Sequence, residues 1–122
     1  MKYPSARKFI ITERYYKRSR PNQSLAQYEA WRTKNPAVVR AVVKKDPALR
    51  NHPRLEREVV KHEVRELKLG YTKYKDRSKP SRAHEDSKAK EPSWLRGELR
   101  KLRKERGWKL LTWKNDLDKG GR

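Results

Sequence analysis

The pair His62-Glu63 comes closest to a catalytic motif in this chain. In His-Glu-x-x-His metalloproteases, two histidines one helical turn apart bind zinc, and the glutamate between them is the general base. Here Glu66 stands in place of the second histidine, and the remaining histidines, His52 and His84, are distant in sequence. We therefore interpret His62 as a residue on the surface of a helix. We expect no metal site, no cofactor and no catalytic residue.

Other common catalytic motifs are also absent from the sequence. The chain has no cysteine, which excludes disulfides, thiolate zinc sites and cysteine nucleophiles. Its five glycines form neither a phosphate-binding loop nor a dinucleotide fingerprint. No apolar run approaches the roughly 20 residues of a membrane-spanning helix. These observations predict a protein that is not an enzyme, has no small-molecule substrate and is not an integral membrane protein.

The strongest signal in the sequence is its positive charge. The 122 residues include 35 Lys and Arg against 15 Asp and Glu, for a formal net charge of +20. Solubility of a small domain needs a net charge of only about 2–8. An excess this large predicts a polyanionic partner, whose phosphates would be neutralised by the Lys and Arg side chains. Hydrophobic residues make up 33% of the chain, well below the roughly 45–50% of an ordinary domain, so we expect little independent core.

The most basic candidate element is a helix at residues 93–106. Leu95, Leu99 and Leu102 fall on one helical face, and Lys and Arg occupy most of the remaining surface. Ser93 is a suitable N-cap and Gly107 a suitable left-handed C-terminal residue. With the Trp- and Leu-containing segment that follows, this unit spans residues 93–113.

The best-defined candidate helix covers residues 53–69. Its apolar face runs from Leu55 to Leu67, and its other face carries nearly balanced acids and bases. Such a face is typical of a helix whose salt bridges lie in solvent. Gly70 follows as the expected helix stop.

Three X-Pro signals, Asn35-Pro36, Asp46-Pro47 and His52-Pro53, are suitable helix starts. We expect helices at 24–34, with Trp31 as a core anchor, and at 36–45, then a short turn at 47–51. Within a basic, aromatic N-terminal arm (residues 1–23), a helix from Ser5 to Lys17 is favoured, although the β-branching of residues 9–12 also fits a strand. The whole is a mainly α chain: a helical region at 24–70 with extended basic N- and C-terminal arms.

Two segments are predicted to have no secondary structure. Residues 71–92 are polar and basic, and they read as a linker that cannot bury a core. Residues 114–122 read as a polar tail.

The candidate RNA-binding residues are the basic side chains of the arm, the linker and the 93–106 helix. They are Arg7, Lys8, Arg14, Lys17, Arg18, Arg20, Lys73, Lys75, Arg77, Lys79, Arg82, Arg96, Arg100, Lys101, Arg103, Lys104 and Arg106. Aromatic residues among them could stack on bases: Tyr15, Tyr16, Tyr71, Tyr74, Trp108 and Trp113. Packing against the protein core is an equally good interpretation of the two tryptophans.

These features together predict a structural RNA-binding protein of a large ribonucleoprotein, with rRNA and neighbouring proteins as partners. In composition and layout the chain is similar to small accessory proteins of ribosomes, organellar ones in particular. The basic, acid-free first dozen residues favour a mitochondrial location, with the cytoplasmic ribosome or a nucleoid as alternatives. A small DNA-binding protein, or a basic subunit of a protein or membrane assembly, are the alternative functions.

Overall fold

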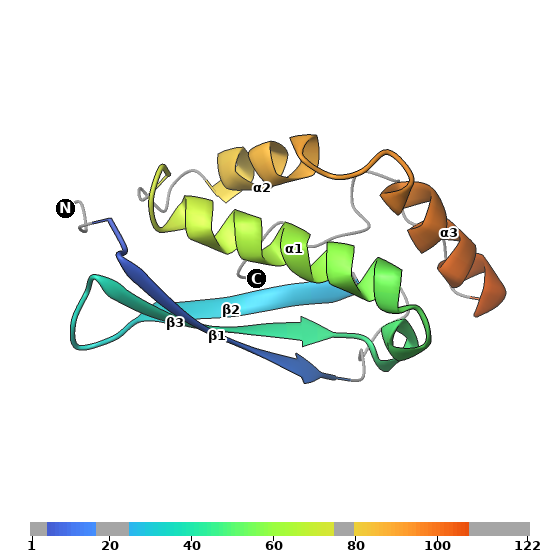
Figure 1. The fold of residues 1–122 in the computed structure, drawn as a ribbon, viewed down its shortest axis with the longest axis horizontal. Helices are drawn as coiled ribbons and strands as arrows, with labels where there is room; N and C mark the ends of the chain where they lie inside the picture. The colour runs from blue at the N-terminus through green and yellow to red at the C-terminus, as the bar shows by residue number, and fades with distance from the viewer. Residues whose placement is uncertain (1–4, 17–24, 75–79, 108–122) are drawn as a thin grey trace.

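A computed structural model describes residues 5–16, 25–74 and 80–107, which form a three-stranded sheet and three α-helices (Figure 1). In chain order the elements are β1 (Lys8–Tyr15), β2 (Ala26–Arg32), β3 (Val38–Lys45), the 3-10 helix η1 (Pro47–Asn51), α1 (Pro53–Gly70), α2 (Pro80–Ala89) and α3 (Leu95–Glu105). The prediction of a mainly α chain with little core is therefore wrong. The fold combines α and β structure.

Strand β3 is the centre of the sheet, which has the order β1-β3-β2. It pairs in parallel with β1 and antiparallel with β2. The turn between β2 and β3 is closed by Asn35, whose Oδ1 accepts a hydrogen bond of 3.1 Å from the amide of Ala37. Asn35-Pro36 thus marks a hairpin turn, where the sequence suggested the start of a helix.

The three N-terminal helices predicted at 5–17, 24–34 and 36–45 are corrected to strands. In β3, Val39, Ala41 and Val43 are buried while Arg40 between them is exposed, which is the two-residue period of a half-buried strand. The β-branched residues of this segment favour the strand as well. Pairing with β1, some 30 positions earlier in the chain, decides the structure, and local spacing alone does not reveal it.

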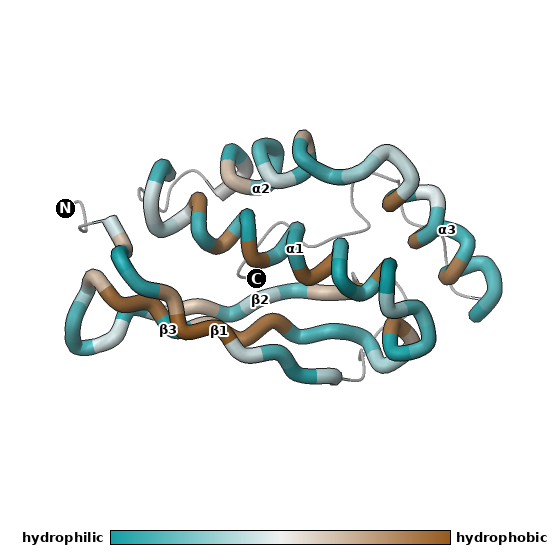
Figure 2. The backbone as a smooth tube through the Cα atoms, in the orientation of Figure 1, coloured by the Kyte–Doolittle hydropathy of each residue, from teal (hydrophilic) through white to brown (hydrophobic). Residues whose placement is uncertain are grey.

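The core lies between the sheet and α1. Val60, Val64 and Leu67 of α1 pack against Tyr28 and Val43 of the sheet. Figure 2 shows the hydrophobic residues of α1 and of the strands facing one another. The predicted helix at 53–69 and its apolar face are therefore confirmed.

A second core cluster lies where α3 meets η1 and the first turn of α1. Leu95, Leu99 and Leu102 of α3 pack there with Leu49 and Leu55. The predicted leucine face of this helix is confirmed. The helix itself begins two residues later than predicted, and no side chain caps its first turn.

The predicted linker at 71–92 contains α2, which lies on the side of α1 that faces away from the sheet (Figure 1). Its buried residues are Ala83, His84 and Ser87. Ser87 Oγ donates a hydrogen bond of 2.7 Å to the carbonyl oxygen of His62. The linker prediction is wrong because this helix buries small and polar side chains against a polar face of α1.

Helix ends follow the sequence signals in part. Asp46 caps η1, since its Oδ1 accepts a 2.8 Å hydrogen bond from the amide of Ala48. Pro53 occupies the first turn of α1. Gly107 has a φ of 69°, as expected for a residue that ends a helix in the left-handed region. Gly70 has a negative φ and is the last residue of α1, so it ends the helix by other means than the left-handed conformation.

Candidate functional site

One face of the sheet is covered by α1, and no described element covers the opposite face (Figure 1). Because side chains alternate along a strand, this open face carries the residues between the buried ones. Trp31 of β2 lies opposite Arg40 of β3, and Arg40 lies opposite Ile10 of β1. These three side chains form one row across the sheet.

Trp31 is the most exposed large hydrophobic residue among those described, with 45% of its surface accessible. The prediction that it anchors the core is wrong, because it falls on the outward positions of β2. Its partner Arg40 is exposed as well. A tryptophan beside a guanidinium on an open sheet is a surface that can stack a planar base and bind a phosphate.

Most other charges on the open face are positive. Lys8 and Arg14 of β1 are exposed, and no described residue forms an ion pair with them or with Arg40. Lys44 binds Glu29 across the strands at 2.5 Å. The face therefore combines three cations that remain available with one neutralised pair.

The structure spreads the predicted RNA-binding residues over several surfaces. Those with exposed side chains are Arg7, Lys8 and Arg14 near or on β1, Lys73 just after α1, Arg82 on α2, and Lys101, Lys104 and Arg106 in or just after the second half of α3, with Arg100 half-exposed. Lys73 and Lys101 bind neighbouring carboxylates, those of Asp86 and Glu98. The predicted residues that lie outside the described part of the chain are Lys17, Arg18, Arg20, Lys75, Arg77, Lys79, Trp108 and Trp113.

Arg96 and Arg103 of α3 lie in the interior, which corrects the expectation that they belong to an open cationic face. Arg96 is 8% exposed and Arg103 is fully buried. Their positions turn them toward the body of the protein, so they do not present a charge to a partner in this conformation.

The predicted stacking tyrosines are engaged within the protein. Tyr71 is buried and its hydroxyl donates to the carbonyl oxygen of Ala30 at 3.2 Å. Tyr74 donates to Asp86 at 2.6 Å. Tyr15 is 36% exposed and its hydroxyl donates a hydrogen bond to Glu56, and Tyr16 is half-buried. These contacts fix strands and helices, and among the described residues they leave Trp31 as the aromatic side chain best presented to a ligand.

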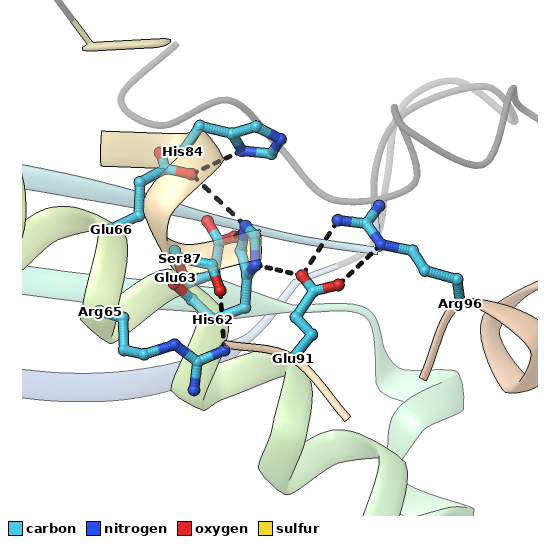
Figure 3. A network of polar contacts seen from close by, with 8 residues as sticks. All are labelled: His62, Glu63, Arg65, Glu66, His84, Ser87, Glu91 and Arg96. Atoms are coloured by element: carbon cyan, nitrogen blue, oxygen red, sulfur yellow. Dashed lines mark hydrogen bonds and ion pairs between the residues drawn. The ribbon is translucent and has the colours of Figure 1, made fainter. Parts of the chain in front are cut away.

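The second notable site is a buried polar cluster between α1 and α2 (Figure 3). It contains His62, Glu63 and Glu66 of α1 and His84 of α2, all at most 1% exposed. The prediction that His62 lies on a helix surface is wrong, because α2 covers this side of α1. Four ionisable side chains out of water require compensating contacts.

The contacts within this cluster converge on one carboxylate oxygen. Glu66 Oε1 lies 2.8 Å from His84 Nδ1 and 3.5 Å from His62 Nε2. Glu63 Oε2 lies 3.7 Å from the same His62 nitrogen. The two imidazole rings meet edge to face, with centroids 5.1 Å apart. His62, Glu66 and His84 each offer a metal-ligand atom, and these atoms all lie within 4.8 Å of one another.

Glu91, just after α2, supports the cluster from the other side of His62. Its carboxylate contacts His62 Nδ1 and accepts two hydrogen bonds from Arg96, at 2.9 and 3.0 Å. Burial raises the pKa of Glu91, but the contacts with His62 and Arg96 outweigh it and hold the pKa below its ordinary value. Glu91 is therefore a carboxylate that orients the His62 ring.

Sequence reasoning missed this cluster although part of its signal was visible. His62 and Glu66 stand four residues apart, on one face of a helix that was correctly predicted. The third member, His84, lies in the segment that was taken for a linker.

Comparisons with protein-family models, curated proteins and solved structures found no match for this chain. Among the described residues, no helix has the length and hydrophobicity needed to cross a membrane.

Proposed function

We propose that this protein is a structural RNA-binding component of a ribonucleoprotein, and that the open face of its sheet binds unpaired nucleotides. The observation that supports this most directly is the exposed row of Trp31 and Arg40, on a face where Lys8 and Arg14 form no ion pair with any described residue. The net charge of +20 supports a polyanion as the partner.

The chemistry of the row favours an unpaired base over a duplex. An exposed indole offers a flat apolar surface, and stacking of one base on an aromatic side chain contributes about 1–3 kcal/mol. A base inside a duplex has both faces covered and cannot stack on the indole. Unpaired bases are common in the loops and bulges of structured RNA, which are the usual targets of sheet-based RNA binding.

The cations around the row supply the contacts with the backbone. Lys8 and Arg14 lie on β1 at the opposite edge from Trp31, so a strand of RNA crossing the sheet would pass over Arg40 on its way to them. Phosphate contacts fix the position of the RNA without reading its sequence. We therefore expect binding with little sequence preference and strong dependence on salt.

The experiment that tests this proposal is a salt series of binding to a single-stranded RNA oligomer, using wild type, Trp31→Ala and Arg40→Gln. Loss of Trp31 should weaken binding by about 1–3 kcal/mol without changing the salt dependence, because the lost contact is uncharged. Loss of Arg40 should also lower the slope of log K against log salt by about 0.7, the value for one phosphate contact to a single strand.

Arg57→Gln is the matched control. Arg57 is an exposed arginine of α1, so this substitution removes the same charge at a position outside the sheet. Equal losses for Arg40→Gln and Arg57→Gln would mean that only total charge matters, and this would refute the role of the open face. Duplex DNA and anionic vesicles are the competing ligands. Tighter binding to either would favour the DNA-binding or membrane-bound alternative.

A further inference from the structure

The buried cluster between α1 and α2 has the composition of a metal site. Two imidazoles and a carboxylate, from His62, Glu66 and His84, bring three ligand atoms within 4.8 Å of one another. Imidazole nitrogen and carboxylate oxygen are common zinc ligands, and imidazole favours zinc and similar transition metals over Mg²⁺ or Ca²⁺. We propose that His62, Glu66 and His84 bind a Zn²⁺ ion that joins α2 to α1.

The spacing of the donor atoms fits a tetrahedral ion. With metal–ligand bonds of about 2.0–2.1 Å, neighbouring ligand atoms of a tetrahedral zinc site are about 3.3 Å apart. Glu66 Oε1 lies 3.5 Å from His62 Nε2 and 2.8 Å from His84 Nδ1, on either side of that value. The third pair, His62 and His84, lies within 4.8 Å, so zinc binding would draw the two imidazole nitrogens closer together.

The tautomer of His62 gives a second, independent argument. Glu91 is a carboxylate and accepts a hydrogen bond from the N–H of His62 Nδ1, which it contacts directly. In that tautomer, Nε2 presents its lone pair toward Glu66 Oε1, which is also an acceptor and lies 3.5 Å away. Two acceptors that face each other out of water are stabilised by a cation between them, and a divalent metal bound there would provide it.

Polar atoms in the cluster also lack partners. Among the described residues, neither Glu66 Oε2 nor His84 Nε2 has a hydrogen bond, although both atoms are buried. The carboxylate of Glu66 lies between the two imidazole rings. One divalent cation bound there would offset its charge.

The surroundings have the form of a zinc site with its second shell. A carboxylate on the far nitrogen of a ligating histidine orients the ring and raises its basicity. Glu91 occupies this place at His62, and Arg96 in turn fixes Glu91 with two hydrogen bonds.

Burial indicates a structural site. The three ligands are at most 1% exposed, whereas a catalytic zinc keeps an open position for its substrate. The ion would connect two ligands of α1 with one ligand of a helix that brings few apolar contacts of its own. We therefore assign the metal the task of fixing α2 in place.

The test uses the full chain, stripped with chelator and titrated with Zn²⁺, with Co²⁺ as a coloured substitute that reports tetrahedral coordination. Wild type should bind one equivalent of Zn²⁺ and melt at a higher temperature with it. Loss of a second-shell partner weakens metal sites by about 10–100-fold, so Glu91→Gln should fall in that range and Glu66→Gln or His84→Gln should lose more than about 100-fold.

His52→Gln is the control, because it removes the one histidine outside the cluster and should leave affinity unchanged. X-ray absorption of the wild-type Zn²⁺ complex gives a readout that needs no variant, and it should show two imidazoles among nitrogen and oxygen ligands. Failure of wild type to bind Zn²⁺ would overturn the proposal. Zn²⁺ binding that is lost in His52→Gln but kept in Glu66→Gln would also overturn the proposal, because it would show that the ion binds an adventitious site on the surface.

Discussion

Lys45 at the end of β3 joins three elements through one buried ammonium. The residue is 5% exposed, and its Nζ lies 2.8 Å from Glu13 Oε1 of β1 and 3.6 Å from Glu56 Oε2 of α1. The same nitrogen lies 4.5 Å from the centre of the Tyr15 ring. Replacing Lys45 therefore tests how strongly electrostatics holds the sheet to its helix.

We expect Lys45→Met to lower the free energy of unfolding by about 1–2 kcal/mol, less than the roughly 3–5 kcal/mol for breaking a fully buried ion pair. The expected cost is smaller than for a fully buried pair because the side chains of Glu13 and Glu56 are 50% and 20% exposed. Water can therefore solvate both carboxylates after the substitution. Loss of the cation–π contact with Tyr15 accounts for about 0.5–1 kcal/mol of the total. Methionine keeps the volume of the aliphatic stem.

The pH dependence of this difference follows from the pKa of Lys45. Burial lowers that pKa, but the hydrogen bond and charge of Glu13, with the charge of Glu56, raise it above its ordinary value of 10.5. A pKa that is higher in the folded state gives stabilisation that is complete below the unfolded-state pKa and is lost as pH rises through the folded-state pKa. The gap between wild type and Lys45→Met should stay constant near neutral pH and close above pH 10.5.

Urea denaturation followed by circular dichroism measures this effect, and Lys44→Met is the matched control. Lys44 pairs with Glu29, a carboxylate that is 57% exposed, and an exposed pair of this kind contributes only about 0.2–1 kcal/mol. Equal stability of the Lys45→Met and Lys44→Met proteins would refute the reasoning. A gap between wild type and Lys45→Met that widens at alkaline pH would do so as well.

Four further substitutions test the helices and their contacts. Leu99→Ala empties a fully buried position of the leucine cluster and should cost about 2–5 kcal/mol in a urea denaturation. Gly97→Ala should stabilise α3 by about 0.5–1 kcal/mol, since a Cβ at this position meets no heavy atom within 4 Å. Gly107→Ala should destabilise the protein by about 1–2 kcal/mol, because Gly107 has a φ of 69°. A change of the same sign for both substitutions would contradict the structure. Tyr74→Phe should raise the pKa of Asp86, which the 2.6 Å hydrogen bond from the hydroxyl now lowers, and an NMR titration that shows no change would rule that cause out.

The two amphipathic helices were predictable because their signals are local. The leucines of α3 and the apolar residues of α1 recur with the helical period. Pro53 is the first residue of α1, and Gly107 adopts the left-handed conformation just after α3. Each of these features depends on residues within a few positions of one another. The sequence therefore contained enough information for these elements before any tertiary contact was known.

The strands were not predictable in the same way. The apolar residues between Val38 and Val43 fit a helix or a strand equally well, since a short run cannot separate the two periods. Arg40 between buried neighbours is the local hint, but its meaning depends on pairing with β1 and β2. Arg40 and Trp31 were both expected in helices, and both lie on the open face of the sheet.

The histidine cluster was hidden by a different effect. A motif search along α1 stops at Glu66, because it expects both histidines on one helix. The third donor, His84, comes from α2, where Ala83 and Ser87 supply the small residues that let the helices approach. A polar helix that packs on a polar face leaves no hydrophobic signal, so composition alone classified it as a linker.

The two proposed sites lie on opposite sides of α1, which makes them separable. The helix packs its apolar face on the sheet and turns His62 and Glu66 toward α2. Loss of the metal should therefore loosen α2 and leave the open face of the sheet as it is. Glu66→Gln should abolish Zn²⁺ binding and change RNA affinity by less than about twofold, or 0.4 kcal/mol. If RNA affinity falls together with the metal, α2 and its exposed Arg82 belong to the RNA interface, and the open sheet face is not sufficient by itself.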